Sequence, residues 1–210
     1  MRDLINELEK VHREVARESA DSDEVVRVTM RRRYPTDAAD LWSALTEPER
    51  IARWFMPVSG DLREGGSFQL EGNANGDILT CNPPSLLRTT FGGPGSIVTL
   101  TLTADSDIET ELELDHTVPL AMAQNVAGAL FVGPGWDGAF LGLGLYVAGE
   151  AIGDPREMAN SPEVVEFNVG SIDCWTTVAG QAGATTEEVE HSRTMALAQF
   201  APHKSGDVEA

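Results

Sequence analysis

The apolar positions at the start of the chain change their period between residues 4 and 34. Four apolar residues first recur at spacings of four, three and four: Leu4, Leu8, Val11 and Val15. This period predicts an amphipathic helix over residues 4–16, packed on the main domain or on a second subunit. An acidic linker is predicted over 19–24. From 25 to 34 apolar and polar residues alternate, which predicts a half-buried strand.

Two short helices are predicted to follow this strand. The first begins at Thr36, which is expected to be its N-cap, with acidic residues in the first turn. The segment Thr46–Glu49 has the spacing of a capping box with a proline inside the first turn. It predicts a second short helix that carries an apolar group: Ile51, Trp54 and Phe55.

A series of short alternating segments then predicts an antiparallel meander. Glycine, proline, asparagine and aspartate separate five candidate strands: 67–71, 77–82, 86–91, 96–104 and 109–117. The connections are short, so consecutive strands are expected to be neighbours in the sheet. With the strand over 25–34, six strands are predicted.

The longest apolar region predicts a helix over 136–150. It contains Gly138, Gly142 and Gly144, and each glycine inside a helix costs about 1 kcal/mol relative to alanine. We expect the close approach of another backbone or of a ligand to offset this cost.

Two more helices are predicted near the C-terminus. Ser161 and the following proline predict the start of a helix over 162–179, with Val165, Ile172 and Trp175 facing inward. A second capping box predicts a helix that begins at Thr185 and ends before Pro202. The tail after Pro202 is predicted to be disordered.

Several local sequences, and the order of the elements, resemble a known family. The motifs are Trp42–Glu49 with Ile51, Trp54 and Phe55, Gly65–Phe68, Gly76–Ile78 with Pro83, Pro84 and Leu87, His116, and Gly135–Trp136. They are similar to the START-like (SRPBCC) superfamily, in the bacterial branch related to the C-terminal domain of the activator of the heat-shock protein 90 ATPase. The resemblance covers about residues 25 to 150.

The chain departs from this family pattern at three points. Phe91 stands where members usually carry tryptophan, and Asp37 stands where a proline commonly opens the first helix. The separate N-terminal domain of the chaperone activator, with its basic activating segment, is replaced by a short helix. The activating function is therefore not carried over.

The resemblance implies an α+β helix-grip fold, in which a curved antiparallel six-stranded sheet wraps around the long helix. We expect an N-terminal helix and linker (1–24), a START-like domain (25–150), a helical extension (151–201) and a disordered tail (202–210).

This scaffold implies a cavity between the sheet and the long helix. The residues expected to line it are Trp54, Phe68, Leu114, His116, Trp136, Phe140 and Leu143, with Leu112 facing the same way and Phe55 closing one end. One interpretation is a pocket for a small hydrophobic or aromatic molecule, with His116 as its hydrogen-bonding anchor. The alternative is that the apolar residues fill the core and that His116 is a structural histidine.

Signs of catalysis are few. The sequence contains none of the Gly-x-Ser-x-Gly, Gly-x-Gly-x-x-Gly, P-loop or His-Glu-x-x-His motifs, so an enzyme is not favoured. No cofactor and no metal are expected. A contact between His116 and Asp137 would support general acid–base catalysis of the cyclase kind.

The charge pattern bears on partners and on the sheet. Lys and Arg number 15 against 34 Asp and Glu, a net charge of −19, which excludes non-specific binding to nucleic acid or to an anionic membrane.

Six acidic residues occupy the odd positions from Asp105 to Asp115 and share one strand face. A calcium site there is disfavoured, because a strand lacks the looped geometry that wraps the ion. We expect instead that Arg27, Arg31 and Arg33 of the first strand bridge to Glu109, Glu111 and Glu113.

Three functions remain open at this level. The first is a START-like binding protein. We expect it in the cytoplasm, since two isolated cysteines indicate a reducing compartment. The second is a co-chaperone or stress-response protein that acts through its surface, and the third is the cyclase-like enzyme. The apolar faces of the terminal helices would allow a homodimer.

Overall fold

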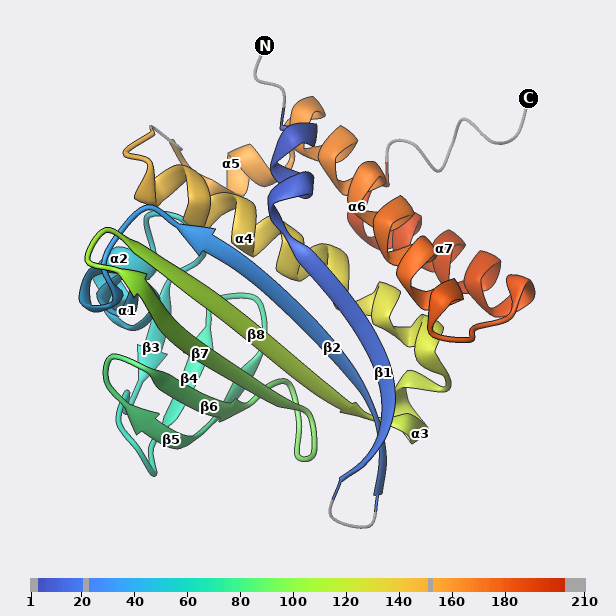
Figure 1. The fold of residues 1–210 in the computed structure, drawn as a ribbon, viewed down its shortest axis with the longest axis horizontal. Helices are drawn as coiled ribbons and strands as arrows, with labels where there is room; N and C mark the ends of the chain where they lie inside the picture. Colours follow the sequence, from blue (N-terminus) through green and yellow to red (C-terminus); the bar gives the residue numbers. More distant parts are fainter. Residues whose placement is uncertain (1–3, 21–22, 151–152, 203–210) are drawn as a thin grey trace.

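The structure, a computed structural model, describes residues 4–20, 23–150 and 153–202. The predicted disordered tail beyond Pro202 lies outside these residues. Within them, all strands form one antiparallel sheet in the order β1-β2-β8-β7-β6-β5-β4-β3. Figure 1 shows the sheet curving on one side of α4, with α6 and α7 beyond that helix. The α+β class and the helix-grip architecture are confirmed.

The sheet contains eight strands in the described part of the chain, two more than predicted. They are β1 (His12–Ala20), β2 (Asp23–Tyr34), β3 (Val58–Gly60), β4 (Ser67–Leu70), β5 (Asn75–Asn82), β6 (Leu86–Thr90), β7 (Ile97–Ser106) and β8 (Glu109–Pro119). The additional strands are β1 and β3. The strand β3 has three residues and pairs with β4, so it is too short to produce an alternating pattern.

Helices cover the ends and one side of the sheet. They are the 3₁₀ helices η1 (Ile5–Lys10) and η2 (Val126–Phe131), and the α-helices α1 (Ala38–Thr46), α2 (Pro48–Ile51), α3 (Leu120–Ala123), α4 (Gly133–Val147), α5 (Pro155–Ala159), α6 (Pro162–Gln181) and α7 (Thr186–Phe200). None of the helices among the described residues combines the length and the apolar character needed to cross a membrane.

The helix predicted over 4–16 is wrong after Lys10. A short 3₁₀ helix ends there, and β1 begins at His12 and pairs with β2 over nine residues. Val11 and Val15 are four positions apart, a spacing that places two residues on one face of a helix and equally on one face of a strand. The β-branched valines and the nearby β2 favour the strand. The acidic linker is accordingly replaced by the ends of this hairpin, apart from residues 21–22, which lie outside the described residues.

Two predicted helix starts also need correction. The N-cap of α1 is Asp37 rather than Thr36, and its side chain accepts a hydrogen bond from the backbone N–H of Asp40 at 2.9 Å. The capping box at α2 is absent, because the Thr46 hydroxyl donates to the carbonyl of Trp42 at 2.8 Å. Trp54 and Phe55 follow α2 instead of lying in it, since this helix ends at Ile51.

The later elements are close to their predicted positions. The five meander strands are present, and α6 and α7 begin after Ser161 and Thr185. The capping box at Thr185 and Glu188 is complete. Helix α4 starts at Gly133, three residues before the predicted Trp136, because Pro134 and the neighbouring glycines form its first turn instead of preceding it. It ends at Val147, before the predicted Glu150.

On the charged face of the sheet, β2 pairs with β8 as predicted. The expected arginine bridges form there, except for the one from Arg27. Strands β2 and β8 are antiparallel neighbours, and Arg31 binds Glu113. Arg33 lies 2.6 Å from Asp105, 3.4 Å from Glu111 and 4.0 Å from Glu109. Arg27 instead binds Glu18 at 2.9 Å, because the unpredicted β1 supplies a nearer carboxylate.

The apolar residues of both terminal regions are buried within the chain. Leu4 and Leu8 belong to a cluster with Leu141, Leu145, Val164 and Phe167. Val11, Val15, Ile172 and Trp175 belong to the main core. These residues therefore serve intrachain packing rather than presenting an apolar face to a second subunit.

Candidate ligand-binding cavity

An apolar cavity lies between the inner face of the sheet and α4. Its volume is about 180 Å³, and it is partly open to solvent. Ligand sites usually measure about 300–1,000 Å³, so this one suits a small guest. An apolar cavity of about 150 Å³ can bind benzene, which shows that a ring-sized molecule needs no more space.

Helix α4 supplies one wall through a single face. Trp136, Ala139, Phe140 and Leu143 line the cavity. They are spaced three, one and three residues apart, which places them on one stripe of an α-helix. Gly142 allows this helix to approach the segment after α2 closely, since a Cβ at this position would lie 2.5 Å from the carbonyl oxygen of Trp54.

The strands supply the opposite wall through alternating residues. The inward side chains are Leu112 and Leu114 on β8, Val98 and Leu100 on β7, Leu87 and Thr89 on β6, and Ile78 and Cys81 on β5. The register of β5 against β6 shifts between Ile78 and Thr80. This irregularity brings Cys81 to the cavity although it is an odd number of residues from Ile78.

Aromatic rings close the ends of the cavity. Trp54 stacks on Phe55 with ring centroids 5.4 Å apart, and its indole N–H donates to the carbonyl of Ala44 at 3.0 Å. Phe91 is 6.3 Å from Phe68 and 5.0 Å from Trp136, centroid to centroid.

The structure brings together six of the seven residues predicted for the cavity wall. They are Trp54, Phe68, Leu114, Trp136, Phe140 and Leu143, and the expected Leu112 and Phe55 line it as well. His116 faces the sheet interior as expected but is not among the lining residues, and it is 2% exposed.

His116 is held between two side chains behind the aromatic wall. The Trp136 indole N–H donates to its Nδ1 at 3.0 Å, and its Nε2 lies 2.8 Å from the Ser96 hydroxyl. An indole N–H can only donate, so the neutral histidine carries its proton on Nε2. Burial lowers the pKa of His116 from 6.5 to about 4. A neutral histidine with both nitrogens engaged positions Trp136 and has no free group to offer a ligand.

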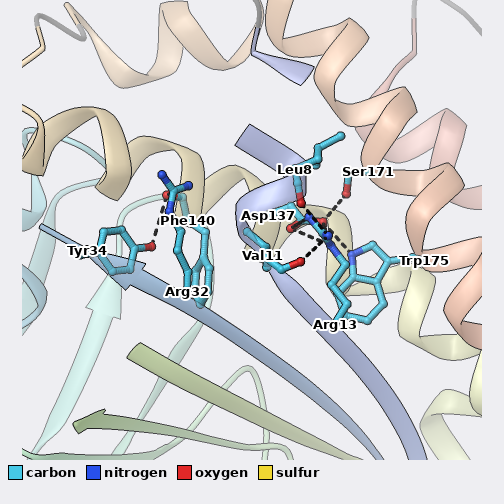
Figure 2. Close-up of polar contacts among 9 residues, drawn as sticks. All are labelled: Leu8, Val11, Arg13, Arg32, Tyr34, Asp137, Phe140, Ser171 and Trp175. Carbon is cyan, nitrogen blue, oxygen red and sulfur yellow. Dashed lines mark hydrogen bonds and ion pairs between the residues drawn. The ribbon is translucent and has the colours of Figure 1, made fainter. Parts of the chain in front are cut away.

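Asp137, the proposed catalytic partner of His116, points away from it into a separate polar network. Its carboxylate accepts two hydrogen bonds from Arg13 Nε, at 3.1 and 3.0 Å, and one from Nη2 at 2.7 Å. The Ser171 hydroxyl and the Trp175 indole N–H also donate to it, at 2.6 and 2.8 Å (Figure 2). The His116–Asp137 contact that would support acid–base catalysis is absent, because Trp136 and Asp137 are consecutive residues of a helix and project in directions about 100° apart.

A second buried cation lies under the middle of α4. Arg32 donates to the carbonyl of Phe140 at 3.2 Å, and Tyr34 donates to the same carbonyl at 3.4 Å (Figure 2). Arg32 also donates to Glu7 at 2.7 Å. Burial raises the pKa of Tyr34 above its usual value. At Glu7, burial would raise the pKa, but hydrogen bonds from Lys10 and Arg32 outweigh it and lower the pKa. These groups anchor α4 to β2 and do not reach the cavity.

The chemistry of the cavity is that of an apolar binding site. None of its lining residues is charged. Among the described residues no group of three or more His, Cys, Asp or Glu side chains is placed to hold a metal ion. The site can bury an apolar guest and offers few polar groups to orient it.

Sequence reasoning missed several lining residues. Val98, Leu100, Leu87 and Thr89 occupy the inward positions of β6 and β7. The alternation within these two strands is the signal that identifies their inward positions. Cys81 could not be found from alternation, because the shift in β5 changes the face on which it lies.

Comparison with known proteins identifies the family. The model of the family described as activator of Hsp90 ATPase homolog 1-like protein matches residues 35–147, more than half of the chain. Among curated proteins, none is significantly similar to this chain.

Solved structures include close and distant neighbours. CalU16 from Micromonospora echinospora is 35% identical, with a TM-score of 0.66 over 80% of this chain and 98% of CalU16. DynU16, a protein of the dynemicin biosynthetic locus, is 25% identical, with a TM-score of 0.50 over 60% of this chain and 48% of DynU16. EF2215 from Enterococcus faecalis shares the fold alone, at 14% identity and a TM-score of 0.57 over 86% of this chain and 96% of EF2215. On the match to the family model and the similarity to CalU16, this chain is a START-like protein of the activator of Hsp90 ATPase homolog 1-like family.

Proposed function

We propose that this protein binds a small hydrophobic or aromatic molecule in the cavity between the sheet and α4. The observation that carries the proposal is the cavity itself, about 180 Å³ and lined almost entirely by apolar side chains. A filled core at native packing density would leave no space of this size. A relative from a biosynthetic locus, DynU16, supports a small molecule as the ligand.

Native mass spectrometry of the freshly purified protein is the first test. A stoichiometric adduct released on denaturation would identify the ligand class and report the oligomeric state. Calorimetric titration with naphthalene supplies the matching test on protein that carries no adduct. We expect saturable binding with one site per chain.

Two substitutions on β6 connect this binding to the cavity. Leu87 lines the cavity, whereas the adjacent Arg88 is exposed on the other face. We expect Leu87→Trp to fill the cavity and reduce the affinity for naphthalene at least tenfold. Arg88→Trp adds the same side chain outside the cavity and should leave the affinity unchanged. Equal affinities in both variants would refute binding at this site.

The family match favours one alternative, a role as a co-chaperone. The matching model describes activators of the Hsp90 ATPase. The corresponding test is a pull-down with Hsp90, combined with a measurement of its ATPase rate with and without this protein. Stimulation that persists in Leu87→Trp would indicate a surface function independent of the cavity.

The free cysteines, the buried terminal residues and the net charge bear on the location of the protein and on its partners. Cys81 and Cys174 are both free thiols, which supports a reducing, cytoplasmic compartment. A homodimer would need a surface other than the buried terminal residues, and the native mass spectrum tests it directly. Nucleic acids and membranes are not proposed as partners, because of the net charge of −19.

A further inference from the structure

Thr89 is a polar residue in the middle of an apolar wall. It lines the cavity from β6 and is 7% exposed. Its neighbours across the sheet are Ile78 on β5 and Val98 on β7, which also line the cavity. In the described part of the chain its hydroxyl makes no hydrogen bond.

The donor hydrogens of the other strong hydrogen-bonding side chains of the wall are already engaged. The Thr46 hydroxyl donates to the carbonyl of Trp42 at 2.8 Å. The indole N–H of Trp54 donates to Ala44, and that of Trp136 donates to His116. The Cys81 thiol is a weak donor and a weak acceptor. Thr89 is therefore the side chain best able to bind a polar group of a guest.

The Thr89 hydroxyl is not fully enclosed. Among the described residues the buried side-chain nitrogen and oxygen atoms without a hydrogen bond are Arg27 Nε, Arg32 Nε and Thr176 Oγ1, so Thr89 Oγ1 keeps accessible surface. Valine has a nearly identical shape and no polar atom, so a ligand that pairs with the hydroxyl would account for the threonine.

We propose that Thr89 is the hydrogen-bonding anchor of the cavity, and that the ligand is an uncharged, ring-sized molecule with one hydroxyl or carbonyl group. This inference rests on the function proposed above. A threonine hydroxyl both donates and accepts, so it suits either group. A charged guest is excluded because the wall offers no countercharge and burying an unpaired ion is costly.

The aromatic rings that line the cavity with Thr89 favour a ring-shaped guest. Phe91 is two residues after Thr89 and lines the same cavity, and its ring is 5.0 Å from that of Trp136. A planar guest in this cavity can contact these rings while it lies beside Thr89. Aromatic pairs in this distance range add attraction beyond the burial of area.

A matched pair of ligands tests the anchor. p-Xylene and p-cresol have nearly the same shape and differ by a methyl group in place of a hydroxyl. Calorimetric titration gives the ratio of their dissociation constants for the parent protein and for Thr89→Val. We expect the substitution to weaken p-cresol about tenfold relative to p-xylene, the effect of one lost hydrogen bond. 4-Methylbenzoate should not bind either protein.

Controls separate the anchor from the cavity. Thr89→Ser keeps the hydroxyl and should preserve the ligand ratio of the parent. Thr89→Val should bind p-xylene within about twofold of the parent and unfold at about the same temperature, since valine nearly matches threonine in shape. An unchanged ratio in Thr89→Val, or binding of 4-methylbenzoate, overturns the inference while leaving the proposed function intact. If the parent binds neither p-xylene nor p-cresol, the proposed function itself fails.

Discussion

At the scale of single residues, the role of His116 is decided by the side chains that enclose it. The inward face of the last strand was predicted, yet the imidazole is enclosed by Ser96, Phe91 and Trp136 instead of facing the cavity. Its neutral form fits this site because one nitrogen accepts and the other donates. Burial of the imidazole lowers its pKa, because the charged form loses its solvation.

The pKa of His116 predicts a loss of stability in mild acid. In the unfolded chain a histidine titrates near 6.5, whereas in the folded protein His116 titrates at about 4. Between these values the unfolded state binds the proton and the folded state does not, so stability is full above 6.5 and falls as the pH decreases toward 4. This group should remove on the order of 2 kcal/mol between pH 7 and pH 5.

Urea unfolding at both pH values measures this effect. His116→Asn lacks the titrating group, so its unfolding free energy should fall less than that of the parent protein over the same interval. His12→Asn, which changes an exposed histidine on β1, should fall as the parent does. Equal pH dependence in His116→Asn and the parent would contradict the assignment.

At the scale of elements, α4 contains three glycines beyond its first turn that disfavour a helix, and close packing explains only some of them. A Cβ at Gly142 would meet the carbonyl oxygen of Trp54 at 2.5 Å, and one at Gly144 would meet the Arg32 guanidinium at 2.3 Å. A Cβ at Gly138 would have nothing within 4 Å. The predicted approach of another backbone therefore holds for Gly142. At Gly144 the close group is a side chain instead, and no contact explains Gly138.

Alanine substitutions should separate these glycines. Gly142→Ala forces a side chain against a backbone carbonyl and should lower the unfolding free energy by about 1–3 kcal/mol. Gly138→Ala has free space and a better helix propensity, so it should raise the unfolding free energy by up to about 1 kcal/mol. Denaturant unfolding of both variants checks the signs. A loss of stability in both would mean that propensity and contact do not explain the sequence of α4.

At the scale of the whole molecule, one buried ion pair joins three distant parts of the chain. Arg13 comes from β1, Asp137 from α4, and the additional donors Ser171 and Trp175 from α6. The side chains of Arg13 and Asp137 are 7% and 0% exposed. The N-terminal hairpin and the C-terminal helices are thereby tied to the helix that lines the cavity. The division of the chain at residues 24, 150 and 201 stays a prediction.

Breaking this ion pair should cost much more than breaking a similar pair on the surface. Asp137→Asn leaves the buried Arg13 without its countercharge, and we expect a loss of about 3–5 kcal/mol. Glu24→Gln breaks the exposed pair with Arg17 on the same hairpin, whose side chains are 55% and 52% exposed, and should change stability by less than about 1 kcal/mol. Urea unfolding of both variants checks the difference. Similar effects would show that the network contributes little to the fold.

The sequence by itself determined the features that depend on local periodicity and on short motifs. The meander strands, α6 and the capping box of α7 follow from alternation, caps and short turns. The pairing of β2 with β8 follows from the resemblance to the helix-grip fold. The family motifs and the inward faces of α4 and β8 also identified six cavity residues. These patterns can be recognised in the sequence because each depends on residues that are close together in the chain.

The tertiary structure decided what depends on contacts between distant segments. The spacing of Val11 and Val15 suits a helix or a strand, and the proximity of β2 selects the strand. Asp137 is directed away from His116 because Arg13, Ser171 and Trp175 converge on it from other elements. Thr89 and Cys81 enter the cavity wall through strand pairing and a shift in register. Pairing, burial and charge compensation act through space, so the order of residues alone does not reveal them.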